Sequence, residues 1–185
     1  MSLLVLIGKT CSGKDTTQNI LIKKYGYKKL VTYTTRPMRD GEIQDNTYHF
    51  ISKNEFEEKI KSNFFLEYRK YYTSDGIWYY GSAKEDYIKD ENLVIILTPE
   101  GVNSIISKGI IPTVIYLHTD EDVIKKRLIN RGDNKREAKR RIEADNKDFN
   151  SISDFKYFIV FNNGDRSLEE VAYEINNLIG GDLNT

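Results

Sequence analysis

The sequence predicts an α/β protein, a doubly wound parallel sheet with helices on both faces, and three observations predict it. Four short apolar runs lack the polar alternation of a half-exposed strand, which is typical of parallel strands buried on both faces. Helical patterns with capping residues separate these runs. A glycine-containing turn joins the first run directly to the first helical pattern. This strand-helix-strand order, with right-handed crossovers, favours the doubly wound arrangement.

The apolar runs and the helix signals follow one another along the chain. A helical pattern begins at Gly13 and ends at a C-terminal glycine cap, Gly26. The buried strands are expected at Leu3–Ile7, Leu93–Leu97, Thr113–Leu117 and Tyr157–Phe161. Capping boxes predict further helix starts at Ser52 with Glu55, Ser82 with Glu85, Ser167 with Glu170 and, more weakly, Thr119 with Asp122.

Two segments depart from this alternation of strands and helices. Residues 31–81 are rich in Tyr, Phe and Thr and predict a small, mostly antiparallel insertion with one short helix. Residues 125–147 are strongly basic around Gly132 and Asp133, which suits a helical lid with a flexible centre. We therefore expect one domain over 1–185, with a core of 1–31, 82–125 and 150–185, an insertion at 32–81 and a lid at 126–149.

Composition limits the class of protein. The chain has 185 residues, 28 Lys+Arg, 28 Asp+Glu and one cysteine. One cysteine excludes an internal disulfide and a multi-thiolate zinc site, and it favours a cytoplasmic protein. Balanced charge argues against a general nucleic-acid binder, and no apolar run approaches the ~20 residues of a membrane helix. A monomer and a homodimer both fit this composition.

The turn after the first strand carries the strongest motif. Its residues match the pattern G-x-x-x-x-G-K and lie between a buried strand and a helix. This is the structural context of the phosphate loop of P-loop NTPases. Backbone N–H groups and the helix N-terminus would bind phosphate oxygens, and a lysine would add a mobile positive charge. An incidental turn with a lysine is the alternative. The expected ATP-binding residues are Gly8, Lys9, Thr10, Cys11, Ser12, Gly13, Lys14, Asp15 and Thr16.

Magnesium binding is expected at the start of the helix. Asp15 stands where Ser or Thr usually reaches the Mg²⁺ ion. A carboxylate can hold Mg²⁺ directly or through water, and Thr16 is a second candidate. Asp15 could equally be a first-turn carboxylate that favours the helix dipole.

Downstream motifs resemble a known family. Residues 34–42 read T-T-R-x-x-R-x-G-E and precede Tyr48-His49-Phe50. Phe-Leu-Glu, ending at Glu67, precedes Tyr-Tyr-Gly-Ser at 79–82, and R-L-x-x-R-G begins at Arg127. Together with the phosphate loop and in this order, these motifs resemble the guanylate kinase family over most of the chain.

The resemblance implies an acceptor site for a nucleoside monophosphate. Guanidinium groups bind phosphate bidentately, and phenolic hydroxyls add neutral donors. A carboxylate offers two acceptors to the ring N–H and exocyclic amine of guanine. By resemblance the phosphate is held by Arg36, Arg39, Tyr48 and Tyr80. Glu42 orients an arginine, and the guanine edge is read by Thr32, Glu67 and Ser82.

The chain departs from the family beyond the insertion. The family usually carries acidic residues where this chain has Ile96 and Thr98. Thr98 can still hydrogen-bond to a base, whereas Ile96 cannot. Residues 71–78 also predict a longer hairpin than usual. Because a buried site rejects a base that leaves its polar groups unpaired, base specificity stays open.

The lid residues are also implied by resemblance. Arg127, Arg131 and Arg141 would contact the donor phosphates and the transferring group, with Arg140 as the alternative to Arg141. A solvated basic helix face is the other interpretation. Asn162, at the end of the last strand, is expected near adenine or in a turn before the next helix.

The implied function is transfer of the γ-phosphate of Mg-ATP to GMP or dGMP, which gives ADP and GDP or dGDP. The partners would be small-molecule nucleotides. Two alternatives remain: a related kinase for another nucleoside monophosphate or a phosphorylated sugar, and a non-catalytic guanylate-kinase-like binding module. A complete phosphate loop with lid arginines speaks against the module. The expected catalytic residues are Lys14, Arg39, Arg127, Arg131 and Arg141.

Overall fold

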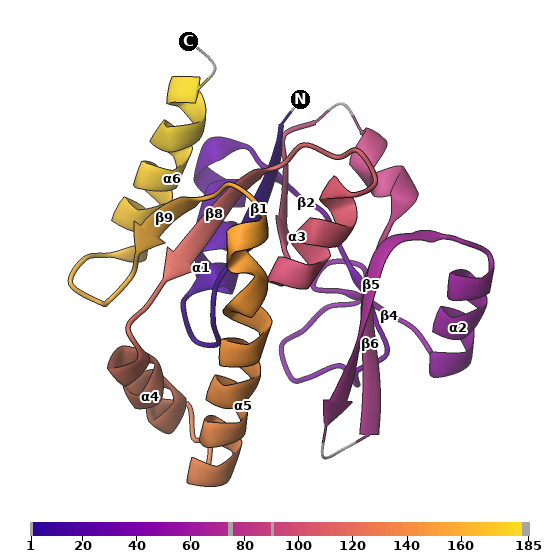
Figure 1. Ribbon diagram of the computed structural model, residues 1–185, viewed down its shortest axis with the longest axis horizontal. Helices are drawn as coiled ribbons and strands as arrows, with labels where there is room; N and C mark the ends of the chain where they lie inside the picture. The colour runs from indigo at the N-terminus through magenta and orange to yellow at the C-terminus, as the bar shows by residue number, and fades with distance from the viewer. Residues whose placement is uncertain (1, 74–75, 90, 183–185) are drawn as a thin grey trace. The chain divides into compact units, whose positions relative to one another are not determined.

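The computed structural model describes residues 2–73, 76–89 and 91–182 and has the predicted α/β fold (Figure 1). The described residues form two compact units. The first lies within 1–29, 91–103 and 111–185, and the second within 30–90 and 104–110. Each unit is built on its own sheet.

A five-stranded parallel sheet organises the first unit, with the order β2-β7-β1-β8-β9. All four predicted strands are present, and β1, β7 and β8 are largely buried. The expected burial of the fourth strand is wrong, because β9 is an edge strand in which only Val160 is buried. One edge strand, β2, was not predicted, because its two residues are lysines and form no apolar run. The strands are β1 (Leu3–Ile7), β2 (Lys28–Lys29), β7 (Leu93–Ile96), β8 (Thr113–His118) and β9 (Phe158–Phe161).

Helices cover this sheet and connect its strands (Figure 1). The capping box at Ser167 is confirmed, since its hydroxyl accepts from the Glu170 amide at 3.2 Å and the Glu170 carboxylate accepts from the Ser167 amide at 2.8 Å. The helices are α1 (Lys14–Tyr25), α3 (Pro99–Ile106), α4 (Glu121–Asn130), α5 (Lys135–Asp148) and α6 (Leu168–Asp182), with the 3-10 turn η2 (Phe149–Asp154). Another 3-10 turn, η1 (Lys84–Ile88), belongs to the second unit.

The expected capping box at Thr119 is wrong. The Thr119 hydroxyl instead donates to the Asn162 carbonyl at 3.0 Å, and Asp120 occupies the N-cap position of α4. Gly26 does cap α1, with a left-handed φ of 74°.

Side chains on both faces of β1 are buried, which explains why its sequence does not alternate apolar and polar residues. Leu4 and Leu6 face a core that also contains Leu21 of α1 and Ile175 of α6. The alternate residue Val5 is fully buried as well. Apolar burial on both faces stabilises the strand that leads directly into the glycine-containing turn.

The second unit contains a four-stranded sheet with the order β4-β3-β6-β5. Two of its three pairings are antiparallel, and α2 (Lys53–Lys61) is its short helix, as predicted. The Ser52 hydroxyl accepts from the Glu55 amide at 3.1 Å, so this capping box is confirmed. Residues 74–75 of the longer hairpin lie outside the described residues. The strands are β3 (Tyr33–Thr34), β4 (His49–Phe50), β5 (Phe65–Thr73) and β6 (Gly76–Ala83).

The capping box expected at Ser82 is wrong. Ser82 belongs to β6, and its hydroxyl donates to Glu67 instead of accepting from a helix amide. The short η1 turn begins two residues later, with Ala83 at its N-cap position. Within the described ranges, no helix combines the length and apolar character needed to cross a membrane.

Stacked aromatic rings form the core of the second unit. Phe56 is fully buried and stacks on Phe65 and Tyr79 with centroid distances of 4.3 and 5.2 Å. Removing this ring leaves a cavity against two other rings. We expect Phe56→Ala to lower the free energy of unfolding, measured in urea, by about 3–5 kcal/mol.

Tyr72→Ala is the control for this variant, because the Tyr72 side chain is 72% exposed. Its effect should stay within about 0.5 kcal/mol. A loss below about 1 kcal/mol in Phe56→Ala would contradict the assignment of this ring to the core.

Candidate active site

The phosphate loop, residues 8–14, connects β1 to α1 through a turn that requires its glycines. A Cβ on Gly8 would lie 2.7 Å from the Leu117 carbonyl oxygen. Gly13 has a φ of 94°, and Cys11 also has a left-handed φ of 55°. These left-handed residues curve the backbone, and a bend of this kind is the geometry in which backbone amides can bind a phosphate.

The helix that follows the loop begins without a side-chain cap. Gly13 is its N-cap residue, so no side chain satisfies the first amides of α1. Free amides and the positive end of the helix dipole favour an anion at this place. The Lys14 ammonium donates to the Lys9 carbonyl at 2.8 Å. Burial lowers the pKa of Lys14, and the nearby Asp15 and Asp145 carboxylates oppose that shift.

Two side chains hold the loop from outside. Asn162, buried at the end of β9, donates from Nδ2 to the Ser12 carbonyl at 2.7 Å. Arg127 of α4 donates to the Cys11 carbonyl at 3.0 Å and to the Asn162 carbonyl at 3.2 Å. The Cys11 and Ser12 carbonyls of the loop therefore have partners outside it. Two predicted site residues therefore also support the loop.

A third contact comes from α5 and was not predicted. The Asp145 carboxylate accepts from the Thr10 amide at 2.6 Å, and the Asn146 Oδ1 accepts from Lys9 Nζ at 2.6 Å. In the sequence, Asp145 and Asn146 lie in a strongly charged helical segment and match no motif. Its only signal is a carboxylate one turn after Arg141, on the same helix face.

The basic lid residues are paired with carboxylates. Arg131 Nε donates to Asp133 at 2.7 Å, and Arg140 and Arg141 donate to Glu137 at 2.7 and 2.8 Å. These hydrogen bonds, the one from Arg140 foremost, lower the pKa of Glu137 to about 2. The helical backbone is interrupted between α4 and α5 at Gly132, whose φ is 90°. Both Arg140 and Arg141 remain candidates for contact with a transferring phosphoryl group.

The start of α1 offers oxygen ligands suited to magnesium. Asp15 and Thr16 lie exposed in its first turn. Among the described residues no three His, Cys, Asp or Glu side chains converge on one point. Mg²⁺ is often held by one or two carboxylates together with substrate phosphates and water, so this donor set fits a nucleotide-bound ion.

In the second unit a buried arginine organises the expected acceptor-phosphate residues. Arg36 is 4% exposed, and its guanidinium donates to both carboxylate oxygens of Glu42 at 2.6 and 2.9 Å. Its Nε donates to the Tyr80 hydroxyl at 3.1 Å, and the Tyr48 ring lies 5.5 Å from its Cζ. The hydrogen bond from Arg36 lowers the pKa of Glu42. The structure thus brings four predicted residues together.

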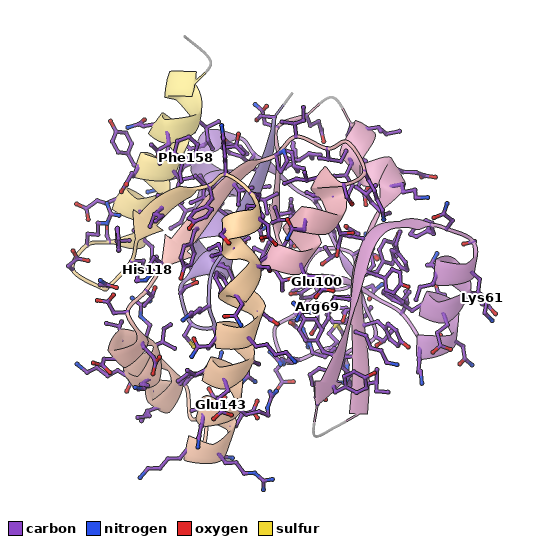
Figure 2. The ribbon with its side chains drawn as sticks, viewed as in Figure 1. Lys61, Arg69, Glu100, His118, Glu143 and Phe158 are labelled. Carbon is purple, nitrogen blue, oxygen red and sulfur yellow. The ribbon has the colours of Figure 1, made fainter. Side chains whose placement is uncertain are left out.

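Arg39 and Arg69 add positive charge near this cluster. The Arg39 amide donates to Glu42 at 2.7 Å, and its side chain is exposed. Arg69 of β5 lies opposite Tyr80 in register, with its guanidinium 4.9 Å from the Tyr71 ring centroid; Figure 2 labels it. The sequence analysis did not single out Arg69, because an alternating position on a strand carries no motif.

The expected guanine-reading residues include one buried hydrogen-bonded chain. Ser82 donates to Glu67 at 2.5 Å and also meets the Tyr87 hydroxyl at 2.7 Å. All three side chains are buried, and burial raises the pKa of Tyr87. Tyr87 was missed by sequence reasoning, since an aromatic residue five positions after a serine is no signal. The structure thus places two of the expected base-reading residues, Glu67 and Ser82, in direct hydrogen-bond contact.

Two other expected base contacts have hydrogen-bond partners of their own. The Thr32 carbonyl accepts from the His49 amide at 2.9 Å, just before β3. The Thr98 hydroxyl accepts from the Gly101 amide at 3.2 Å and so caps α3. Thr98 therefore already has a structural partner.

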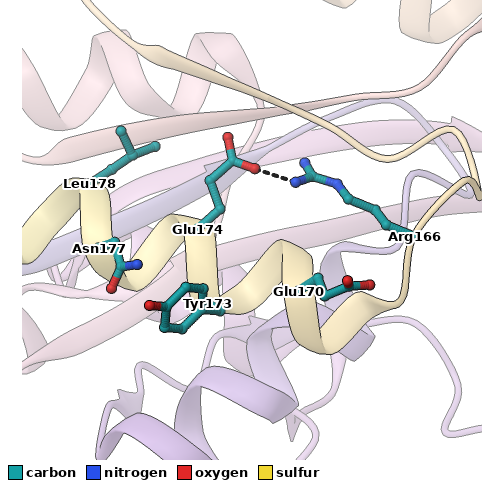
Figure 3. A pocket seen from close by; sticks show the side chains of 6 residues that line it. All are labelled: Arg166, Glu170, Tyr173, Glu174, Asn177 and Leu178. Carbon is teal, nitrogen blue, oxygen red and sulfur yellow. Dashed lines mark hydrogen bonds and ion pairs between the residues drawn. The ribbon is translucent and has the colours of Figure 1, made fainter.

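A surface pocket lies elsewhere in the first unit, along α6 (Figure 3). Its Arg166 donates to Glu174 at 2.5 Å and to the Phe161 carbonyl at 2.7 Å. No residue predicted for the site lines it. The lining residues are Arg166, Glu170, Tyr173, Glu174, Asn177 and Leu178.

Comparison with known proteins decides the family. The family model described as guanylate kinase matches residues 1–178. The chain belongs to the guanylate kinase family. It is 34% identical over 166 residues to the guanylate kinase of Clostridium tetani, covering 85% of this chain and 77% of that protein. It is 33% identical over 180 residues to the guanylate kinase of Sulfurimonas denitrificans, covering 92% and 83%.

Solved structures show the same fold. The guanylate kinase of Anaplasma phagocytophilum superposes with a TM-score of 0.73 at 18% identity, covering 98% of this chain and 85% of that one. The YorR protein of Bacillus subtilis, in complex with phosphorylated GDP, superposes with a TM-score of 0.56 at 20% identity, covering 100% and 99%. The family resemblance predicted from the sequence motifs is thus confirmed.

The Arg36–Glu42 pair makes a pH-dependent contribution to stability. Glu42→Gln leaves a buried guanidinium without its carboxylate, and we expect a loss of about 3 kcal/mol at pH 7. The folded-state pKa of Glu42 lies below its ordinary value of 4.5. The stabilisation by this carboxylate is therefore present above pH 4.5 and is lost as the pH falls through the folded-state pKa.

Urea unfolding of the wild type and Glu42→Gln, from pH 7 down to the acid range, measures this difference. Glu58→Gln is the matched control, because Glu58 is an exposed glutamate of α2 in the same unit. A Glu42→Gln penalty that stays unchanged well below pH 4.5 would contradict the charged pair.

Proposed function

We propose that the protein is a kinase that transfers the γ-phosphate of ATP to GMP or dGMP and so produces ADP and GDP or dGDP. The observation that carries this proposal is a preformed phosphate loop with Lys14 at its mouth, in a chain that the guanylate kinase model matches over residues 1–178. ATP-dependent chemistry and a single cysteine suit a cytoplasmic enzyme, which could act as a monomer or a homodimer.

On the donor side, the loop amides and Lys14 would bind the β- and γ-phosphates, and Asn162 would lie near adenine. Asp15, with Thr16 as second ligand, would hold a Mg²⁺ ion on the nucleotide. Bound there, the ion neutralises phosphate charge. The residues proposed to hold ATP are those of the loop together with Asp15, Thr16 and Asn162.

On the acceptor side, four donors would bind the monophosphate: Arg36, Arg39, Tyr48 and Tyr80. Glu42 fixes the Arg36 guanidinium by a two-point hydrogen bond. The Pro37 carbonyl and the Tyr80 hydroxyl accept two further N–H groups, which leaves one N–H of Arg36 for a phosphate oxygen. Exposed Arg39 would supply a mobile second cation. Base reading is assigned to Glu67 and Ser82, with Thr32 and Thr98 as further contacts.

Catalysis would come from positioning and charge neutralisation. Phosphoryl transfer needs the acceptor oxygen, the phosphorus and the leaving oxygen in line, and the protein supplies little covalent chemistry. Arg127, Arg131 and Arg141 would neutralise the charge of the transferring group, after Arg131 and Arg141 leave their carboxylate partners. Exclusion of water would suppress ATP hydrolysis.

A coupled ADP-release assay tests this function with Mg-ATP and each of GMP, dGMP, AMP, CMP, UMP and dTMP. We expect turnover with GMP and dGMP, and a loss of at least about 100-fold in Lys14→Ala, because a preorganised charge at the transferring phosphate is removed. ATP binding without turnover of any acceptor would overturn the proposal.

One observation favours a second candidate, a kinase for another nucleoside monophosphate. Ile96 is aliphatic where the family usually has an acid, and the Thr98 hydroxyl is engaged by the Gly101 amide. Turnover confined to a different base in the same assay would establish this candidate. The phosphate chemistry would then stand, and the guanine assignment would fall.

Base reading by Glu67 has its own test. Glu67→Gln places an amide donor against the donors of guanine, so we expect kcat/KM for GMP to fall about 100-fold. Steady-state kinetics with GMP and AMP in parallel measure this effect, and kcat/KM for AMP should not fall. An equal loss with both acceptors would point to a structural role for Glu67.

A further inference from the structure

We propose that Asp145 is a positioning residue that anchors helix α5 to the phosphate loop and thereby sets where Arg141 lies relative to the γ-phosphate. This inference rests on the proposed kinase function, because it concerns the same donor site. All the residues involved belong to the first unit.

The anchor consists of two adjacent hydrogen bonds. Asp145 Oδ2 accepts from the Thr10 amide at 2.6 Å, and Asn146 Oδ1 accepts from Lys9 Nζ at 2.6 Å. The first is charge-assisted and partly buried, which makes it the stronger kind of hydrogen bond. Two contacts from successive helix residues restrict both the rotation and the translation of the helix.

Helix periodicity connects this anchor to the lid cations. Glu137, Arg141 and Asp145 are spaced by four residues, so they lie along one face of α5. Arg141 therefore lies about one turn, with a rise of about 6 Å along the helix axis, from the residue bound to the loop. In the resting structure Arg141 donates to Glu137 at 2.8 Å. With α5 fixed at Asp145, a change of side-chain partner suffices to bring Arg141 toward a bound phosphoryl group.

The charges around Asp145 explain why a carboxylate can remain there. Burial raises its pKa, whereas the Thr10 amide and the ammonium groups of Lys14 and Lys9 oppose that shift, and Asp148 adds to it. The position is costly for a negative charge, because ATP would bring further negative charge to the same loop. A hydrogen-bonding role at Thr10 accounts for this placement better than a role in attracting nucleotide.

Three variants test the role. Asp145→Ala removes the anchor, and Asp145→Asn keeps an oxygen acceptor for the Thr10 amide but removes the charge. Glu143→Ala is the matched control on the same helix; Figure 2 labels this residue. Its exposed carboxylate contacts Lys139 at 3.7 Å.

The kinetic readout separates positioning from binding. We expect kcat of Asp145→Ala to fall about 10- to 100-fold, since a small misplacement of a catalytic group has effects of this size. The Kd for ATP should change less than about threefold, because binding is not what the anchor supplies. Asp145→Asn should recover most of the lost kcat, and Glu143→Ala should match the wild type.

Amide hydrogen exchange at Thr10 provides a readout that needs no acceptor. We expect faster exchange at Thr10 in Asp145→Ala and near wild-type protection in Asp145→Asn and Glu143→Ala. If the wild type binds ATP but phosphorylates no monophosphate, the proposed function fails, and this exchange pattern still tests the anchor by itself.

Three results would overturn the proposal. Unchanged Thr10 exchange in Asp145→Ala would show that there is no anchor. Tighter ATP binding with unchanged kcat would show that the carboxylate merely competes with phosphate. Parallel losses of kcat and melting temperature in Asp145→Ala and Asp145→Asn would indicate a purely structural role.

Discussion

Backbone amides can surround an anion only if the neighbouring carbonyl oxygens have partners elsewhere, and this constraint shapes the first unit. Three carbonyls of the phosphate loop have such partners: that of Lys9 accepts from Lys14, that of Cys11 from Arg127, and that of Ser12 from Asn162. An unpaired buried carbonyl would cost free energy and would favour collapse of the loop. The donors thus keep the loop open before any nucleotide is bound.

The strands of the parallel sheet position the residues that surround this loop. Central β1 ends at Ile7, and at the next residue, Gly8, the Leu117 carbonyl of β8 leaves no space for a side chain. The end of β9 supplies Asn162, whose amide donates to the His118 carbonyl at the end of β8. Because parallel strands end at one edge of the sheet, residues distant in sequence meet at the loop. The fold therefore determines the chemistry of the site.

The sequence predicts these features to the extent that they depend on local patterns. Continuous apolar runs identify the four long strands, and glycine spacing identifies the loop. The run at β9 does not reveal that this strand lies exposed at the sheet edge, because burial depends on which elements pack against it. Strand β2 escapes prediction, because its two residues are lysines, which form no apolar run, and their register with β7 is a backbone feature. The pattern at Ser82 was misleading, since this S-x-x-E spacing begins near the end of β6, where Ser82 donates to Glu67 of the neighbouring strand β5, and reaches Glu85 in the η1 turn. Asp145 acts through a contact 135 residues distant in the chain, which no single-sequence pattern reveals.

The most direct test of a preformed loop is ¹⁵N relaxation of the nucleotide-free protein, read at the amides of residues 9–14. If the outward carbonyl contacts hold the loop, these amides should have order parameters near the rigid-backbone value of about 0.85. Addition of ATP should then change their chemical shifts but barely change their order. Order parameters below about 0.6 that rise only with ATP would contradict the account, because the nucleotide would then be forming the loop.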